Sequence, residues 1–211
     1  MKTILCYGDS NTWGYDPVTT NRYPRGVRWT SLLQAALPEY CILEEGLGGR
    51  TTVQSDPMEP GRNGVEYLPV ALKTHDPIDL VLLMLGTNDC KNRYRMCAAE
   101  IADGMQMLAE TVHTPWMHLR KQPEILIVAP APMVPEALAQ GGMRHMFGAE
   151  SVETSRHLAP FYRELAQRIG VHFFDAGTVT AAEADGVHLS PDGHRKLAEA
   201  FASLLPSLLE D

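Results

Sequence analysis

The sequence has few of the patterns that mark nucleic-acid-binding or membrane proteins. It has no lysine or arginine run, and 26 acidic residues outnumber 18 basic ones, giving a formal net charge of −8. Nucleic-acid binders usually carry a basic patch, so this balance argues against a nucleic-acid partner. No apolar stretch approaches the ~20 residues of a membrane span. The apolar run before Gly8 is too short for a signal peptide, so we expect a cytoplasmic protein without a membrane partner.

Cysteine and histidine are present without metal-site spacing. The four cysteines, Cys6, Cys41, Cys90 and Cys97, contain no CxxC pair, and we interpret them as reduced packing residues. The eight histidines form no HExxH motif or closely spaced ligand set, so we expect no metal. With 211 residues, 45% of them hydrophobic, the chain is predicted to form one domain spanning residues 1–211.

Short apolar runs that break at glycine alternate with segments of helical periodicity. This alternation predicts an α/β fold of three layers, α/β/α, with a five-stranded parallel sheet covered on both faces. The region 133–150 is irregular and is predicted to be a surface loop that helps to shape a pocket. The expected strands are 4–7, 40–44, 80–85, 124–129 and 171–174, and the expected helices are 29–38, 64–75, 98–119, 151–169 and 191–209.

Residues suited to acyl-transfer chemistry follow the ends of different strands. Ser10 follows the first strand, the glycines 46–49 follow the second, and Asn88 follows the third. Carboxyl ends of parallel strands meet at one edge of a sheet, where ligands bind. Asp185 and His188 lie just before the last helix and suit the orienting acid and general base of a Ser–His–Asp triad. The amide of Asn88 and the backbone N–H groups of Gly49 and Ser10 are candidate oxyanion donors.

Each of these motifs has a structural alternative. Gly-Asp-Ser-Asn is also ordinary turn composition, and a loop histidine or asparagine can serve only to cap backbone groups. A dinucleotide site is disfavoured because Thr51 stands where a GxGxxG motif needs its third glycine. The α/β-hydrolase elbow is excluded because Thr12 replaces the final glycine of GxSxG. Asp192 and His194 are interpreted structurally, since both lie in a helix predicted to begin with Ser190 as N-cap and Pro191 in its first turn.

Taken together, four sequence blocks resemble the SGNH (GDSL) hydrolase family. They are Gly8-Asp9-Ser10, Gly49, Gly86-x-Asn88-Asp89 and Asp185-x-x-His188. Longer stretches, including Cys6–Gly14, Glu44–Thr52 and Phe173–Gly177, resemble the bacterial arylesterase/acyltransferase branch over nearly the whole chain.

The resemblance implies a flavodoxin-like fold with strand order 2-1-3-4-5, a serine acyl-enzyme without cofactor, and the roles given above for Ser10, Gly49, Asn88, Asp185 and His188. Asp9, Asn11 and Trp13 are expected to line the substrate pocket; Asn11 stands where the family usually has leucine. Relatives of this branch are often oligomers, so a homo-oligomer is a further expectation.

The sequence therefore predicts a serine esterase that hydrolyses short-chain carboxylic esters and transfers acyl groups to other acceptors. Its expected partner is a small-molecule ester. One alternative is a carbohydrate or small-metabolite O-acetylesterase that uses the same triad. An alternative from another class is a non-catalytic flavodoxin-like protein that binds a nucleotide or a partner at the same edge of the sheet.

Overall fold

A parallel sheet of five strands forms the centre of the computed structural model, which describes residues 1–209. The strand order is β2-β1-β3-β4-β5, and every neighbouring pair is parallel. This arrangement confirms the predicted sheet and the strand order that the family resemblance implied. The strands are β1 (Lys2–Gly8), β2 (Tyr40–Gly46), β3 (Leu80–Met84), β4 (Glu124–Ala129) and β5 (His172–Asp175).

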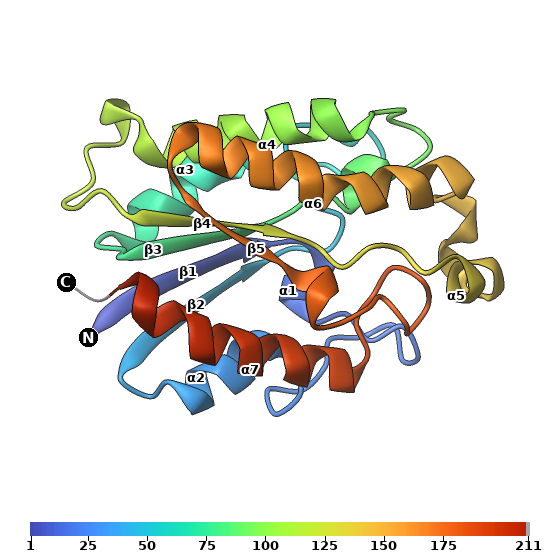
Figure 1. Ribbon diagram of the computed structural model, residues 1–211, viewed down its shortest axis with the longest axis horizontal. Helices are drawn as coiled ribbons and strands as arrows, with labels where there is room; N and C mark the ends of the chain where they lie inside the picture. The colour runs from blue at the N-terminus through green and yellow to red at the C-terminus, as the bar shows by residue number, and fades with distance from the viewer. Residues whose placement is uncertain (210–211) are drawn as a thin grey trace.

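Helices cover both faces of the sheet, as Figure 1 shows, with α3, α4 and α6 on one face and α2 and α7 on the other. The α-helices are α1 (Ser10–Trp13), α2 (Trp29–Ala36), α3 (Gly64–His75), α4 (Ala98–His113), α5 (Pro135–Gln140), α6 (Ala149–Ile169) and α7 (Pro191–Leu208). Short 3-10 helices are η1 (Asn88–Cys90), η2 (Pro115–Met117), η3 (Gly142–His145) and η4 (Ala176–Thr178).

Side chains that alternate along the strands pack into two hydrophobic cores, one on each face of the sheet. Leu5 and Tyr7 of β1 pack in the core beneath α3, α4 and α6, whereas Ile4 and Cys6 pack in the core beneath α2 and α7. This is the period-2 alternation of a strand buried on both faces. All five residues of β3 are buried, which explains why a continuous apolar run marks this strand in the sequence.

Three segments differ from the sequence prediction. The helix predicted over 98–119 ends at His113, and the 3-10 turn η2 begins at Pro115, which has no N–H to donate to the preceding turn. The region 133–150, predicted to be irregular, contains α5 and η3. The short helix α1 was not predicted, because four residues are too few to show helical periodicity. The predicted start of the last helix is confirmed, with Ser190 as N-cap accepting from Gly193 N–H.

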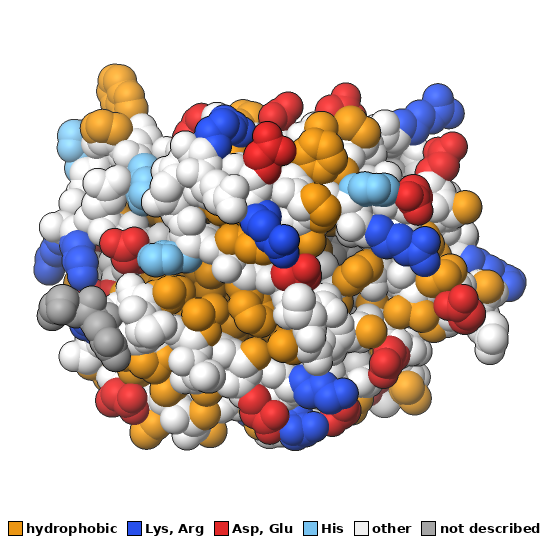
Figure 2. All heavy atoms as spheres, in the orientation of Figure 1, with side chains coloured by type: hydrophobic (Ala, Val, Ile, Leu, Met, Phe, Trp, Pro, Cys, Tyr) orange, Lys and Arg blue, Asp and Glu red, His pale blue; other side chains and the backbone are white. Residues whose placement is uncertain are grey.

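The surface carries charges of both signs. Acidic and basic side chains are interspersed on the face drawn in Figure 2, without a large patch of one sign. Of the helices within residues 1–209, none is both long and apolar enough to cross a membrane.

Candidate active site

Ser10 lies at the carboxyl end of β1 as the first residue of α1. Asp9 caps this helix, because its side chain accepts a hydrogen bond from Asn11 N–H at 2.9 Å. The helix packs so closely on the end of β2 that a Cβ atom at Gly46 would lie 2.2 Å from the backbone nitrogen of Trp13. Glycine at 46 therefore allows α1 to hold Ser10 against the sheet edge.

Ser10, His188 and Asp185 form a continuous hydrogen-bonded chain. His188 Nε2 lies 3.0 Å from Ser10 Oγ, and His188 Nδ1 lies 2.8 Å from Asp185 Oδ2. All three residues are buried. This is the geometry in which an imidazole accepts a serine proton while a carboxylate orients the ring.

The other oxygen of Asp185 fixes the turn that carries the histidine. Asp185 Oδ1 accepts from the backbone N–H groups of Val187 (3.0 Å) and His188 (2.8 Å). Burial alone would raise the pKa of Asp185, but the hydrogen bonds and the charge of His188 outweigh it and hold this pKa below its ordinary value. Asp185 is thus kept ionised beside the imidazole.

Asn88 and Gly49 lie with Ser10 around one cavity of about 270 Å³, which we call the Ser10 cavity. Asn88 opens η1 directly after β3, and its Nδ2 donates to Arg50 O at 3.1 Å. Gly49 has φ +80°, a left-handed conformation that favours glycine. The structure therefore brings together all five residues that the sequence assigned to the triad and the oxyanion donors.

Two buried acids connect the loops around this cavity. Asp9 Oδ2 accepts from Asn88 Nδ2 at 3.4 Å. Asp89 accepts from the backbone N–H of Thr52 at 3.0 Å and from its hydroxyl at 2.5 Å. Burial raises the pKa of Asp9 to about 6 and that of Asp89 to about 6. Both side chains thus bind protein donors and tie the loops after β1, β2 and β3 together.

Arg50 fixes the ends of two strands beneath the site. Its Nη1 donates to Gly8 O at 2.9 Å and to Glu45 O. The guanidinium lies 4.1 Å from the centroid of the Tyr7 ring, a cation–π contact. Because Arg50 O also accepts from Asn88, this residue links β1, β2 and the Asn88 turn.

The predicted substrate-pocket residues Asp9, Asn11 and Trp13 do not line the Ser10 cavity. Asp9 and Asn11 are buried and hydrogen-bonded to protein groups. Trp13 is half-buried, with the Arg22 guanidinium 5.4 Å from its ring centroid. Successive side chains of α1 are rotated by ~100° per residue, and of this helix only Ser10 lines the cavity.

The cavity walls come largely from loops. Tyr15 lies in the loop 14–26, and Met143, Met146 and Phe147 lie in the region 133–150, which was expected to help shape the pocket. Glu59, Arg62 and Lys91 also line the cavity and were missed. Tyr15 contacts the His188 ring at a centroid distance of 4.5 Å. Loop sequences show no periodicity. The position of a residue in a loop near the carboxyl end of a strand was therefore the only sequence signal that could have placed Glu59, Arg62 and Lys91 at the cavity.

His194 is buried away from the triad. Its Nδ1 accepts from Trp29 N–H at 3.3 Å, and its ring packs edge-on against Tyr23. Asp192 is exposed and forms ion pairs with Arg195 and Lys196. The structure thus places both residues in structural roles. Within residues 1–209, no group of three or more His, Cys, Asp or Glu side chains is arranged to hold a metal ion.

Comparisons with known proteins agree with this geometry. Residues 6–196 match the model of the GDSL-like lipase/acylhydrolase family. The structure is similar to Est24, a carbohydrate acetylesterase from Sinorhizobium meliloti, with 40% identity and TM-score 0.92, covering 99% of this chain and 100% of that one. It is equally similar to the M. smegmatis aryl esterase, with 39% identity, TM-score 0.92 and the same coverage.

The fold extends to more distant relatives. A member of the lipolytic G-D-S-L family from Veillonella parvula shares the fold at 18% identity, with TM-score 0.71 over 98% of this chain and 99% of that one. A search of curated protein sequences gave no match. The family model covers most of the chain, and two full-length structural relatives are about 40% identical to it. The chain therefore belongs to the GDSL-like lipase/acylhydrolase family.

Proposed function

We propose that the protein is a serine esterase that hydrolyses short-chain carboxylic esters through an acyl-enzyme. The hydrogen-bonded chain Ser10–His188–Asp185 carries this proposal, because it opens on a cavity that Asn88 and Gly49 also line. A nucleophile, a base, an orienting acid and oxyanion donors around one cavity are the groups that acyl transfer requires.

In the proposed mechanism, Ser10 Oγ attacks the ester carbonyl while His188 Nε2 takes the serine proton. Asp185 stabilises the imidazolium. The carbonyl oxygen becomes an oxyanion that accepts hydrogen bonds from Asn88 Nδ2 and from the N–H groups of Gly49 and Ser10. His188 then protonates the departing alcohol. Water, activated by His188, hydrolyses the acyl-enzyme and releases the acid.

The size and lining of the Ser10 cavity support small ester substrates. Its volume of about 270 Å³ is slightly below the ~300–1,000 Å³ that ligand pockets usually span. Met143, Met146 and Phe147 supply an apolar wall against which a short acyl or aryl group packs. We further propose that alcohols compete with water for the acyl-enzyme, which product analysis in mixtures of water and alcohol would measure.

Substitution of Ser10 tests the mechanism. Ser10→Ala should abolish turnover of p-nitrophenyl acetate and labelling by a fluorophosphonate, while the wild-type protein is labelled at Ser10. Retention of wild-type turnover by Ser10→Ala would exclude the mechanism. An unlabelled wild-type protein, or one purified with flavin absorbance, would favour the non-catalytic alternative.

A carbohydrate or small-metabolite O-acetylesterase is the second candidate. It is supported by the 40% identity to Est24, a carbohydrate acetylesterase, and by the polar wall of Glu59, Arg62 and Lys91, which offers hydrogen bonds to hydroxyl groups. Comparison of kcat/KM for acetylated sugars and aryl acetates separates the two candidates.

We propose a cytoplasmic location and a homo-oligomeric state as additional parts of this function. The free cysteines Cys6, Cys41, Cys90 and Cys97 support a reducing compartment. Fractionation of the native host and light scattering of the purified protein test these two points.

A further inference from the structure

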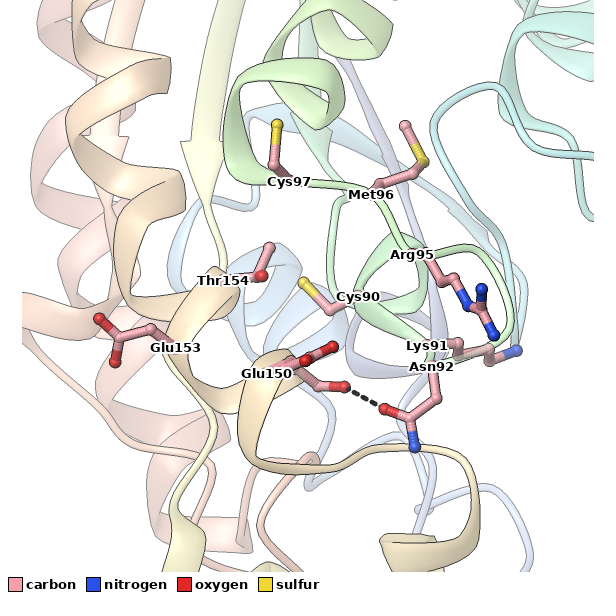
Figure 3. A pocket seen from close by; sticks show the side chains of 10 residues that line it. Cys90, Lys91, Asn92, Arg95, Met96, Cys97, Glu150, Glu153 and Thr154 are labelled. Carbon is pink, nitrogen blue, oxygen red and sulfur yellow. Dashed lines mark hydrogen bonds between the residues drawn. The ribbon is translucent and has the colours of Figure 1, made fainter.

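Lys91 is a buried cation in the wall of the Ser10 cavity. Only 3% of its side chain is exposed. Its backbone N–H donates to Asn88 O at 3.2 Å, so the residue follows directly from the turn that positions Asn88. Lys91 also lines a neighbouring cavity together with Cys90 and Cys97, and Figure 3 shows its side chain extending away from their sulfur atoms.

The carboxylate of Asp56, which lies near Lys91, is committed to other donors. Asp56 Oδ2 lies 3.8 Å from Lys91 Nζ, beyond hydrogen-bond distance. Both Asp56 oxygens accept from Arg93 Nη1, at 3.0 and 3.1 Å, and Oδ1 also accepts from Met58 N–H at 2.9 Å. Asp56 is therefore already neutralised by Arg93.

The other charges in the cavity wall form a pair of their own. Arg62 Nε donates to Glu59 Oε2 at 3.2 Å. Within residues 1–209, the Lys91 ammonium donates no hydrogen bond that meets normal geometry. The charged side chains that line the cavity, Glu59, Arg62 and Lys91, sum to one positive charge, and the buried carboxylate of Asp9 acts on Lys91 from outside this lining. Burial lowers the pKa of Lys91, while the charges of Glu59 and Asp56 act in the opposite direction.

A buried ammonium without acceptors is costly unless a ligand or water supplies them. A carboxylate supplies both the acceptor oxygens and the compensating charge, and its hydrogen bonds are about twice as strong as those of a neutral acceptor. A hydroxyl or carboxamide oxygen supplies an acceptor only. The excess charge therefore favours an anionic group over a neutral one of the same shape.

Building on the proposed esterase function, we propose that Lys91 binds an anionic group of the substrate, so that the enzyme prefers esters carrying a carboxylate. The carboxylate lies in the Ser10 cavity against Lys91 Nζ while the ester carbonyl faces Ser10 and Asn88. Lys91 is thus a specificity residue that contacts the part of the ester remote from the reacting bond.

The test compares matched esters in wild-type protein and in Lys91→Met, which keeps the side-chain length without the charge. The leaving-group esters are 3- and 4-acetoxybenzoate, with the corresponding acetoxybenzamides as neutral partners. For an anion on the acyl side, ethyl hydrogen adipate is compared with diethyl adipate. We expect Lys91→Met to lower the ratio of kcat/KM for the anionic ester to that for its neutral partner by about 10- to 100-fold in at least one pair.

Arg95→Met is the matched control, because Arg95 belongs to the same segment and lines the neighbouring cavity but not the Ser10 cavity. It should leave every ratio unchanged. If Lys91→Met lowers kcat/KM equally for anionic and neutral esters, the proposal is overturned, since Lys91 would then act on the oxyanion common to all esters. Unchanged ratios in all pairs would overturn it as well.

A binding measurement separates this proposal from the esterase function itself. Calorimetry should show 4-hydroxybenzoate or adipate binding to the wild-type protein more tightly than 4-hydroxybenzamide or adipamide, and the preference should disappear in Lys91→Met. If this preference appears in a protein that hydrolyses none of the esters, the anion site stands and the esterase function fails. If the protein hydrolyses the esters but prefers neither anionic esters nor anionic ligands, the esterase function stands and the anion site fails.

Discussion

Asn11 holds His188 in place through the backbone on both sides of the histidine. Its Nδ2 donates to Val187 O at 3.1 Å, and its Oδ1 accepts from Leu189 N–H at 3.0 Å. Asn11 follows the nucleophile Ser10 in α1, so one short helix positions both the serine and the segment of its base. An apolar side chain at this position would have no polar group to make these two bonds.

Asn11→Ala should therefore destabilise the protein and slow catalysis. The variant leaves buried backbone groups of Val187 and Leu189 without partners, which costs about 1–3 kcal/mol of unfolding free energy. It also loosens His188, so kcat for p-nitrophenyl acetate should fall on the order of tenfold. Urea unfolding and steady-state kinetics measure the two effects. Asn21→Ala removes only an exposed local bond to Thr19 O and is the control; equal behaviour of the two variants would contradict the positioning role.

Asn88→Ala should reduce kcat for p-nitrophenyl acetate by about 100- to 1000-fold, the usual cost of losing one oxyanion donor. KM should change little, because the bond forms fully only as negative charge develops on the carbonyl oxygen. Asn92→Ala is the control: Asn92 lies four residues later, is exposed, and bonds Ser151 outside the Ser10 cavity. Unchanged turnover in Asn88→Ala would remove Asn88 from the mechanism.

Adjacent glycines give a test of the backbone donor. Gly49 has φ +80°, and a Cβ atom there would lie 2.8 Å from Glu59 Oε2, whereas a Cβ at Gly48 meets nothing within 4 Å. Gly49→Ala should cost about 1–2 kcal/mol in backbone strain and, by turning its N–H away from the oxyanion, lower kcat on the order of tenfold or more. Gly48→Ala should retain activity. Urea unfolding and steady-state turnover of the two variants measure these effects. Equal turnover in Gly49→Ala and Gly48→Ala would exclude Gly49 N–H as an oxyanion donor.

The sheet and the five candidate site residues could be predicted because their signals are local. A strand buried on both faces, such as β3, is a continuous apolar run, and its end is marked by Gly86. Ser10, Gly49 and Asn88 each follow the end of a strand by a few residues. The parallel topology alone then places them at one edge of the sheet, so no knowledge of side-chain packing is needed.

The cavity wall could not be predicted, because it depends on tertiary packing. Glu59 and Arg62 lie in a loop with no periodicity, and Lys91 reads as an ordinary surface lysine although its side chain is buried. Asn11 and Trp13, expected in the pocket with the family resemblance, do not line the Ser10 cavity. They lie in the unpredicted helix α1, and neighbours in a helix face different directions.

The buried histidine His194 should make the protein less stable in mild acid. Burial, together with the positive charges of His188 and Arg28, lowers the pKa of His194 from 6.5 to about 4. Above pH 6.5 the residue is neutral in the folded and unfolded states and contributes no pH dependence. Between pH 6.5 and 4, His194 is protonated in the unfolded chain but neutral in the folded protein. The free energy of unfolding therefore falls by about 3 kcal/mol over this range.

His194→Gln isolates this effect, because glutamine keeps an acceptor for Trp29 N–H but does not titrate. Asp9 and Asp89 act in the opposite direction: their raised pKa values favour the folded state as pH falls through 6. Both acids are present in both proteins, so their contributions cancel in the difference. Urea unfolding from pH 7 to 4 should therefore show the variant gaining about 3 kcal/mol relative to wild type.

The exposed residue His157 provides the control, and His157→Gln should follow the wild-type curve. Parallel curves for wild type and His194→Gln would show that His194 titrates alike in both states, and would assign the acid sensitivity to other groups.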